Sequence, residues 1–143
     1  MDYIFQNVED VISIEMISEK NAKITSMKNS FENCINLEKI KINGFDTSQV
    51  TSMHKLFYNS YISDENKENF NITLNTSNVE DMSYIFSLTN LKQLDLSSFD
   101  TKNVKNMSHM FEGCTSLNNI NLDIDTNNVE DMSYMFQYCE SLY

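Results

Sequence analysis

The chain is poor in residue types that many functional sites require. Its 143 residues include no proline, no tryptophan and only two glycines, Gly44 and Gly113. Because phosphate-binding loops need several glycines close together, the sequence excludes a glycine-rich nucleotide site. Basic residues are also scarce, with 10 Lys and Arg against 21 Asp and Glu and a net charge of −11. This acidity argues against nucleic acid and anionic membrane surfaces as partners, since both would repel the chain.

Long apolar runs are missing as well, so we expect no membrane insertion. A content of 41% hydrophobic and 22% charged residues is typical of a globular protein, and the length suits one domain. The first basic residue is Lys20, and the opening MDYIF already follows the repeat described next. The sequence therefore predicts no signal peptide in this chain.

A repeat of 25 to 29 residues organises the chain. Each copy carries a methionine followed four residues later by a phenylalanine: Met1 and Phe5, Met27 and Phe31, Met53 and Phe57, Met82 and Phe86, Met107 and Phe111, Met132 and Phe136. A fixed period in this range indicates a solenoid. We interpret the chain as one domain with full repeats at 24–49, 50–78, 79–103 and 104–128 and partial repeats at 1–23 and 129–143.

Each repeat has two halves with different periods. Apolar residues at i, i+3 and i+4 around the methionine predict short helical turns, near 2–6, 28–32, 54–58, 83–87, 108–112 and 133–137. The LxxLxL half predicts short parallel strands, near 14–16, 40–42, 72–74, 94–96 and 120–122. The second repeat has lost its FDT turn and has gained an insertion, 61–69, which we expect to bulge as a loop while Ile72 and Leu74 stay in register. The expected fold class is an α/β solenoid.

The full motif, LxxLxL followed by F-D-T-S/K-x-V-x-x-M-x-x-x-F-x-x-C, resembles the BspA-like leucine-rich repeats of bacterial and protist surface proteins. It is most similar to the methionine–phenylalanine variant of mycoplasma and lactobacillus surface proteins. The resemblance implies a curved right-handed β/α superhelix with its strands on one face. It also implies adhesion or binding at a cell surface, or by a secreted protein.

Residues for catalysis or metal binding are not grouped in the sequence. Cys34, Cys114 and Cys139 share one repeat position that elsewhere holds Val, Ser or Thr. We therefore expect them to be small buried side chains, and a Cys114–Cys139 disulfide is the alternative. His54 and His109 lie two repeats apart without a CxxC motif, which argues against zinc. We expect no enzyme activity, no cofactor and no metal.

Two surfaces remain as candidate binding sites for a protein or glycan. The strand face would present polar side chains in columns that run from coil to coil, among them Lys39, Lys41, Asn71, Thr73, Gln93, Asp95, Asn119 and Asn121. The helix face would present the three rings Tyr84, His109 and Tyr134.

Two function classes fit these surfaces. One is a non-enzymatic interaction or adhesion module of a surface protein, and the other is an intracellular structural or regulatory scaffold. The terminal residues keep the ordinary repeat pattern instead of a polar cap. We therefore expect end-to-end self-association or continuation in a longer array.

Overall fold

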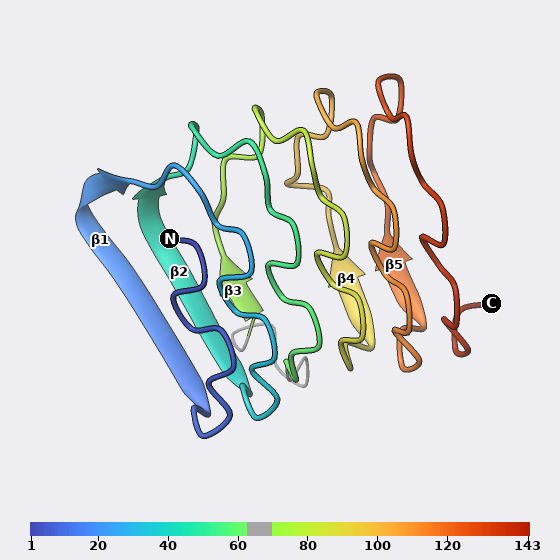
Figure 1. Ribbon diagram of the computed structural model, residues 1–143, viewed down its shortest axis with the longest axis horizontal. Helices are drawn as coiled ribbons and strands as arrows, with labels where there is room; N and C mark the ends of the chain where they lie inside the picture. The colour runs from blue at the N-terminus through green and yellow to red at the C-terminus, as the bar shows by residue number, and fades with distance from the viewer. Residues whose placement is uncertain (63–69) are drawn as a thin grey trace.

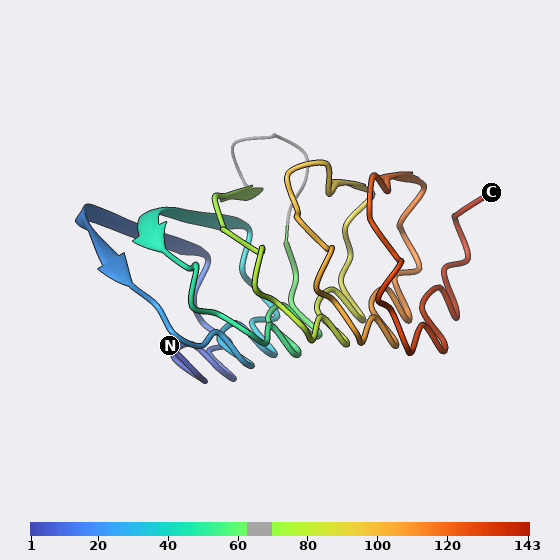
Figure 2. The same cartoon turned by 90° about the horizontal axis from the view of Figure 1, so that it is seen from above.

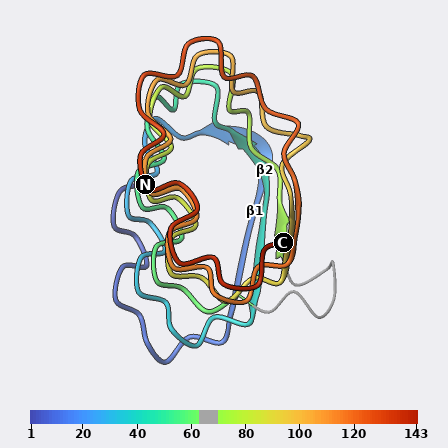
Figure 3. The same ribbon diagram turned by 90° about the vertical axis from the view of Figure 1, so that its right-hand side faces the viewer.

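The chain winds into successive coils that lie side by side, one for each repeat, with the two termini at opposite ends (Figure 1). The computed structural model describes residues 1–62 and 70–143. From residue 63 onward, the predicted bulge at 61–69 lies outside the described residues. Figure 2 shows the coils from above, and Figure 3 looks along the stack, where the coils follow one another around a shared outline.

One side of the coils is made of parallel strands. The strands are β1 (Ser13–Lys23), β2 (Lys39–Asp46), β3 (Phe70–Ile72), β4 (Gln93–Asp95) and β5 (Asn119–Asn121). They form two sheets, one with the order β1-β2-β3 and one with β4-β5. Gly44 in β2 has a φ of 75°, and a Cβ there would lie 2.1 Å from the Ser18 carbonyl oxygen of β1. Only glycine allows the two strands to approach at this point.

The third strand lies two residues earlier than the sequence predicted. β3 covers 70–72 instead of 72–74. Ile72 therefore pairs with Ile42, whereas the sequence predicted that Leu74 would pair with Ile42. Since side chains alternate with a period of two, a shift of two residues leaves the same face toward the core. The apolar pattern fits both registers equally well, which is why it could not choose between them.

The turn that follows the strands is present in every full repeat, including the one in which it was expected to be lost. Thr47 donates a hydrogen bond to the Asn75 carbonyl at 3.1 Å and accepts one from the Asn75 N–H at 2.7 Å. Thr76 and Thr101 bond to the following coil in the same way, and all three threonines are buried. Asn75-Thr76 therefore replaces the Asp-Thr pair of the other repeats.

The predicted helical turns are wrong. Within residues 1–62 and 70–143 the chain forms no helix, and the six segments that begin at the repeat methionine are chains of tight turns. We call them the turn segments: 1–8, 27–34, 53–60, 82–89, 107–114 and 132–139. Among the described residues, no helix is long and apolar enough to cross a membrane.

Hydrogen bonds between coils replace those of a helix. In the turn segment 53–60, the N–H groups of Lys55, Phe57 and Asn59 donate to carbonyls of the next coil at 3.1, 2.9 and 2.8 Å. Lys55 and Asn59 have positive φ values of 54° and 50°, which no α-helix contains. Two successive turns of this kind place residues i and i+4 on one side of the backbone, much as a helix does. The apolar spacing therefore did not separate the two conformations.

The core is a column of phenylalanine rings that runs through all six turn segments. Neighbouring rings of Phe5, Phe31, Phe57, Phe86, Phe111 and Phe136 stack with centroids 5.2–5.9 Å apart. Phe31, Phe57, Phe86 and Phe111 are fully buried, with the repeat methionines beside them. Burial of this apolar surface drives each coil to stack on the next.

Candidate interaction surfaces

The three rings predicted for the helix face meet in the structure, on turn segments instead of helices. The Tyr84 and His109 rings stack with centroids 4.3 Å apart and planes 6° apart. The His109 and Tyr134 rings stack at 4.8 Å and 24°. All three residues have a φ of 57°, the same repeat position and the same outward direction. We call these residues the ring column.

Further side chains that the sequence analysis did not single out extend the ring column. The ring of His54 contacts the edge of Tyr84 with centroids 5.8 Å apart, and Tyr58 contacts Tyr84 at 6.1 Å. Lys55 Nζ lies 4.6 Å from the centroid of Tyr58, within the range of a cation–π interaction. Tyr58 is the only tyrosine at its repeat position, so the repeat pattern gave no signal for it.

Ionisable groups beside the ring column are held by specific partners. His109 Nδ1 lies 2.7 Å from Glu112 Oε2, and His54 Nδ1 lies 2.7 Å from Ser83 Oγ. Burial lowers the pKa of His54, so its ring is neutral at neutral pH. The ring column therefore presents uncharged aromatic surface around His54, next to a cation at Lys55.

Glu32 provides a buried negative charge at the other end of this surface. Its carboxylate accepts a hydrogen bond from Asn29 at 2.7 Å and lies 3.5 Å from Lys55 Nζ. Burial opposes ionisation, but the hydrogen bonds from Asn29 and Gln6 and the Lys55 charge outweigh it and lower the pKa of Glu32. Glu32 thus fixes the position of Lys55 against the tyrosine rings.

The predicted strand-face residues are divided between two sheets. Lys39 and Lys41 belong to β2, whereas Gln93, Asp95, Asn119 and Asn121 belong to β4 and β5. Their side chains lie at the surface and bond to each other across strands: Lys41 Nζ contacts Glu15 at 2.8 Å, and Asn121 Nδ2 donates to Asp95 at 3.1 Å.

The register of the third coil changes the columns expected on this face. Asn71 pairs with Lys41 instead of Lys39, and the Thr73 hydroxyl donates to Asn43 at 3.1 Å, beyond the end of β3. The prediction that Asn71 aligns with Lys39, and Thr73 with Lys41, is therefore wrong. The strand face is not one continuous surface but two polar patches.

The cysteines are free thiols, so the Cys114–Cys139 disulfide, which had been left open as the alternative, is not formed. Each thiol donates to the carbonyl of a phenylalanine in the preceding coil, at 3.0–3.1 Å. Burial raises the pKa of Cys34 and of Cys114 to about 11. These thiols pack the coils together and are poor nucleophiles. The described part of the chain holds no cluster of three or more His, Cys, Asp or Glu suited to a metal ion.

A family model described as "Mycoplasma protein of unknown function, DUF285" matches the chain twice, over residues 1–73 and over residues 59–143. The two matches together cover the whole chain and overlap at 59–73. No curated protein and no solved structure matches the chain.

Proposed function

The chain belongs to this Mycoplasma family, DUF285, and we propose that it is a non-enzymatic interaction module of a surface protein. In this proposal the stacked coils are a leucine-rich-repeat solenoid of the BspA-like kind. The module binds a protein or glycan partner through the outer surface of the solenoid. Its role is adhesion or scaffolding at the cell surface.

The ring column is the single observation that carries the proposal. Tyr134 is 57% exposed, while its neighbour His109 is stacked between two tyrosines. Tyrosine is a frequent anchor residue at protein interfaces. Rings that are already stacked lose little side-chain entropy when a partner binds. Such a surface suits recognition, and its groups have no arrangement for nucleophilic chemistry.

The alternative is an intracellular structural or regulatory scaffold. It is favoured by the three free thiols, since a reducing compartment keeps thiols unpaired. In that case the ring column would serve an internal partner of the same chemistry.

A binding screen against extracellular matrix proteins and glycans tests the proposal. Any ligand found is titrated against the variants Tyr134→Asn and Tyr3→Asn. Tyr3 is the matched control because it occupies the same repeat position, with a φ of 58° and 56% exposure, at the other end of the stack. Asn29 occupies this position in the second turn segment, so asparagine suits the backbone.

We expect Tyr134→Asn to weaken binding at least ~10-fold and Tyr3→Asn to leave it unchanged. Equal effects of the two substitutions, or no binding by the wild-type chain, would contradict the proposal.

We also propose that the chain associates with itself head to tail. In each inner turn segment, at least three N–H groups donate to the next coil, and three carbonyls accept from the coil before. Within the described chain, the equivalent N–H groups of Tyr134, Phe136 and Tyr138 donate to no residue, and the carbonyls of Asp2, Ile4 and Gln6 accept from none. Donors at one end thus match acceptors at the other. The same match would join further repeats of a longer array.

Sedimentation of the 143-residue chain at rising concentration and salt tests this association. Because two copies of net charge −11 repel each other, we expect assembly to increase with ionic strength. Met132→Glu adds a charge to the last coil, where Met132 is 48% exposed, and should abolish assembly. Ile35→Glu, at a similarly exposed residue within the stack, should not. A wild-type chain that stays monomeric throughout would refute the proposal.

A further inference from the structure

An asparagine ladder runs along the turn segments and stops at one coil. Asn33 Nδ2 donates to Asn7 Oδ1 at 2.7 Å, and Asn59 Nδ2 donates to Asn33 Oδ1 at 2.8 Å. The next residue at this repeat position is Leu88, which has no amide. Asn59 Oδ1 therefore accepts no hydrogen bond from the residues that the structure describes.

Leu88 is an unusual residue for its backbone position. Its φ is 59°, whereas the equivalent positions 7, 33, 59 and 113 hold asparagine or glycine and position 138 holds tyrosine at a φ of 62°. A left-handed conformation costs a residue with a branched side chain about 1–2 kcal/mol. Leu88 gains little burial in return, because its side chain is 45% exposed and lies over Gly113 of the next coil. Burial alone therefore does not explain an exposed apolar side chain at this position.

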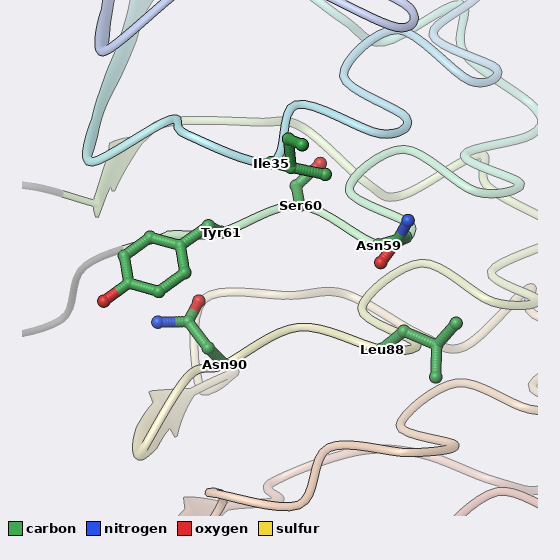
Figure 4. Close-up of a pocket in the computed structure, with 6 residues that line it drawn as sticks. All are labelled: Ile35, Asn59, Ser60, Tyr61, Leu88 and Asn90. Carbon is green, nitrogen blue, oxygen red and sulfur yellow. The ribbon is translucent and has the colours of Figure 1, made fainter. Parts of the chain in front are cut away.

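A hollow opens where the ladder stops. It has a volume of about 200 Å³, is open to solvent and is lined by Ile35, Asn59, Ser60, Tyr61, Leu88 and Asn90 (Figure 4). Ile35, Tyr61 and Leu88 are 42–46% exposed, so apolar surface is concentrated here. Figure 4 shows Tyr61 beside Asn90 on one side and Asn59 beside Leu88 on the other.

The polar groups of the hollow offer one acceptor and one donor. Asn90 Oδ1 accepts from the Ile62 N–H at 2.7 Å, which orients the amide. Asn90 Nδ2 then remains as a donor, since it donates to no described residue, and Asn59 Oδ1 remains as an acceptor. Among the residues that the structure describes, none with a charged side chain lines the hollow. This lining suits a neutral ligand that has hydroxyl groups for hydrogen bonds and an apolar face.

We propose that the hollow binds one sugar unit of a neutral glycan. The C–H face of the sugar packs on the Tyr61 ring and on Leu88. Its hydroxyls donate to Asn59 Oδ1 and accept from Asn90 Nδ2. The inference rests on the proposed binding of a glycan partner but places the glycan apart from the ring column.

An array of neutral oligosaccharides built from hexoses and N-acetylhexosamines tests the proposal, followed by titration of any ligand found. Leu88→Asn supplies the missing amide to Asn59 and removes one apolar wall, so it should weaken binding at least ~10-fold. Tyr61→Ala should weaken it similarly through loss of the ring. Tyr3→Asn, which lies outside the hollow and the ring column, is the matched control and should leave this binding unchanged, and Tyr134→Asn tests the ring column. Thermal melting shows that each variant is folded.

The outcomes separate the two proposals. Loss of glycan binding in Leu88→Asn and Tyr61→Ala, but not in Tyr134→Asn, supports the hollow. Loss in Tyr134→Asn alone overturns the hollow and supports the ring column. Failure of the wild-type chain to bind any neutral oligosaccharide overturns the hollow, while protein binding through the ring column can still be observed.

Discussion

The two sides of the coils are held together differently. On the side of the turn segments, every coil donates backbone hydrogen bonds to the next, and the phenylalanine stack runs from Phe5 to Phe136. On the strand side, β3 and β4 belong to different sheets, and β1 and β2 are far longer than the other strands. The spacing of the coils is thus set by the turn segments, while the strand side accommodates differences in length.

The position of the insertion agrees with this difference. The two matches of the family model overlap at 59–73, a range that contains β3, the last strand before the break between the two sheets. The rings of Phe57 and Phe86, on either side of this region in sequence, still stack with centroids 5.7 Å apart. The longer sequence spacing between these two phenylalanines therefore leaves the ring stack unbroken.

The largest expected effect comes from removing a central ring of that stack. Phe86→Ala deletes a fully buried ring between Phe57 and Phe111 and should lower the free energy of unfolding by about 3–5 kcal/mol. Urea denaturation measures the change. Phe136→Ala is the control, because Phe136 is only partly buried and has one ring neighbour. An equal loss in both variants would mean that stacking within the turn segments does not set stability.

If Phe86→Ala fails to fold, Phe86→Leu gives the same test with a smaller change in volume. Its loss should still exceed that of Phe136→Leu.

The next effect concerns the threonines that join the turn segments to the strand side. Thr101 donates to the Asp125 carbonyl at 3.0 Å and accepts from the Asp125 N–H at 2.8 Å. Thr101→Val leaves both backbone groups without their partner and should cost about 1–3 kcal/mol in unfolding experiments. Thr126→Val, at the exposed equivalent residue in the last full repeat, should be near neutral. Comparable losses would show that the buried threonine bonds add nothing.

The sequence predicted the features that repeat and missed those that depend on one coil. The positions of β4 and β5 followed, to within one residue, from residues that recur every 25 residues. The register of β3 did not, because a period of two cannot separate shifts of two residues. The helical turns were wrong because apolar spacing suits both conformations. A usable signal was present in Asn7, Asn33, Asn59 and Gly113, residue types that tolerate positive φ.

The candidate site was predicted in part, for the same reason. Tyr84, His109 and Tyr134 share one repeat position, so any stack of coils brings them together. Lys55 has that position too, but its contacts depend on Glu32 and on Tyr58, which is the one tyrosine at its repeat position. The break in the asparagine ladder at Leu88 is likewise a departure from the repeat. A site formed by residues that differ from the repeat pattern can be recognised only when the structure shows which residues of neighbouring coils are in contact.

A smaller effect on stability is expected at Glu32, the buried carboxylate that contacts Lys55. Because the pKa of Glu32 is lowered below its ordinary value of 4.5 in the folded chain, its charge stabilises the fold at neutral pH. That contribution is lost as the pH falls through the folded pKa. Glu32→Gln should therefore melt below the wild type at pH 7, and the two melting curves should converge in more acidic solution. Parallel curves at all pH values would contradict the assigned charge.

The smallest expected effect is a gain in stability at Leu88. Leu88→Asn relieves the strain of φ 59° and adds an amide that continues the ladder from Asn59. Replacing a residue in a left-handed conformation with one that tolerates it should add about 0.5–1 kcal/mol to the free energy of unfolding. Asn59→Leu is the reciprocal change: it creates the same defect one coil earlier, at a φ of 50°, and should destabilise the chain by a similar amount. Urea midpoints of the two variants measure both changes. If Leu88→Asn were instead less stable than the wild type, Leu88 would be packing the turn segments together. The break in the asparagine ladder would then serve the stability of the stack.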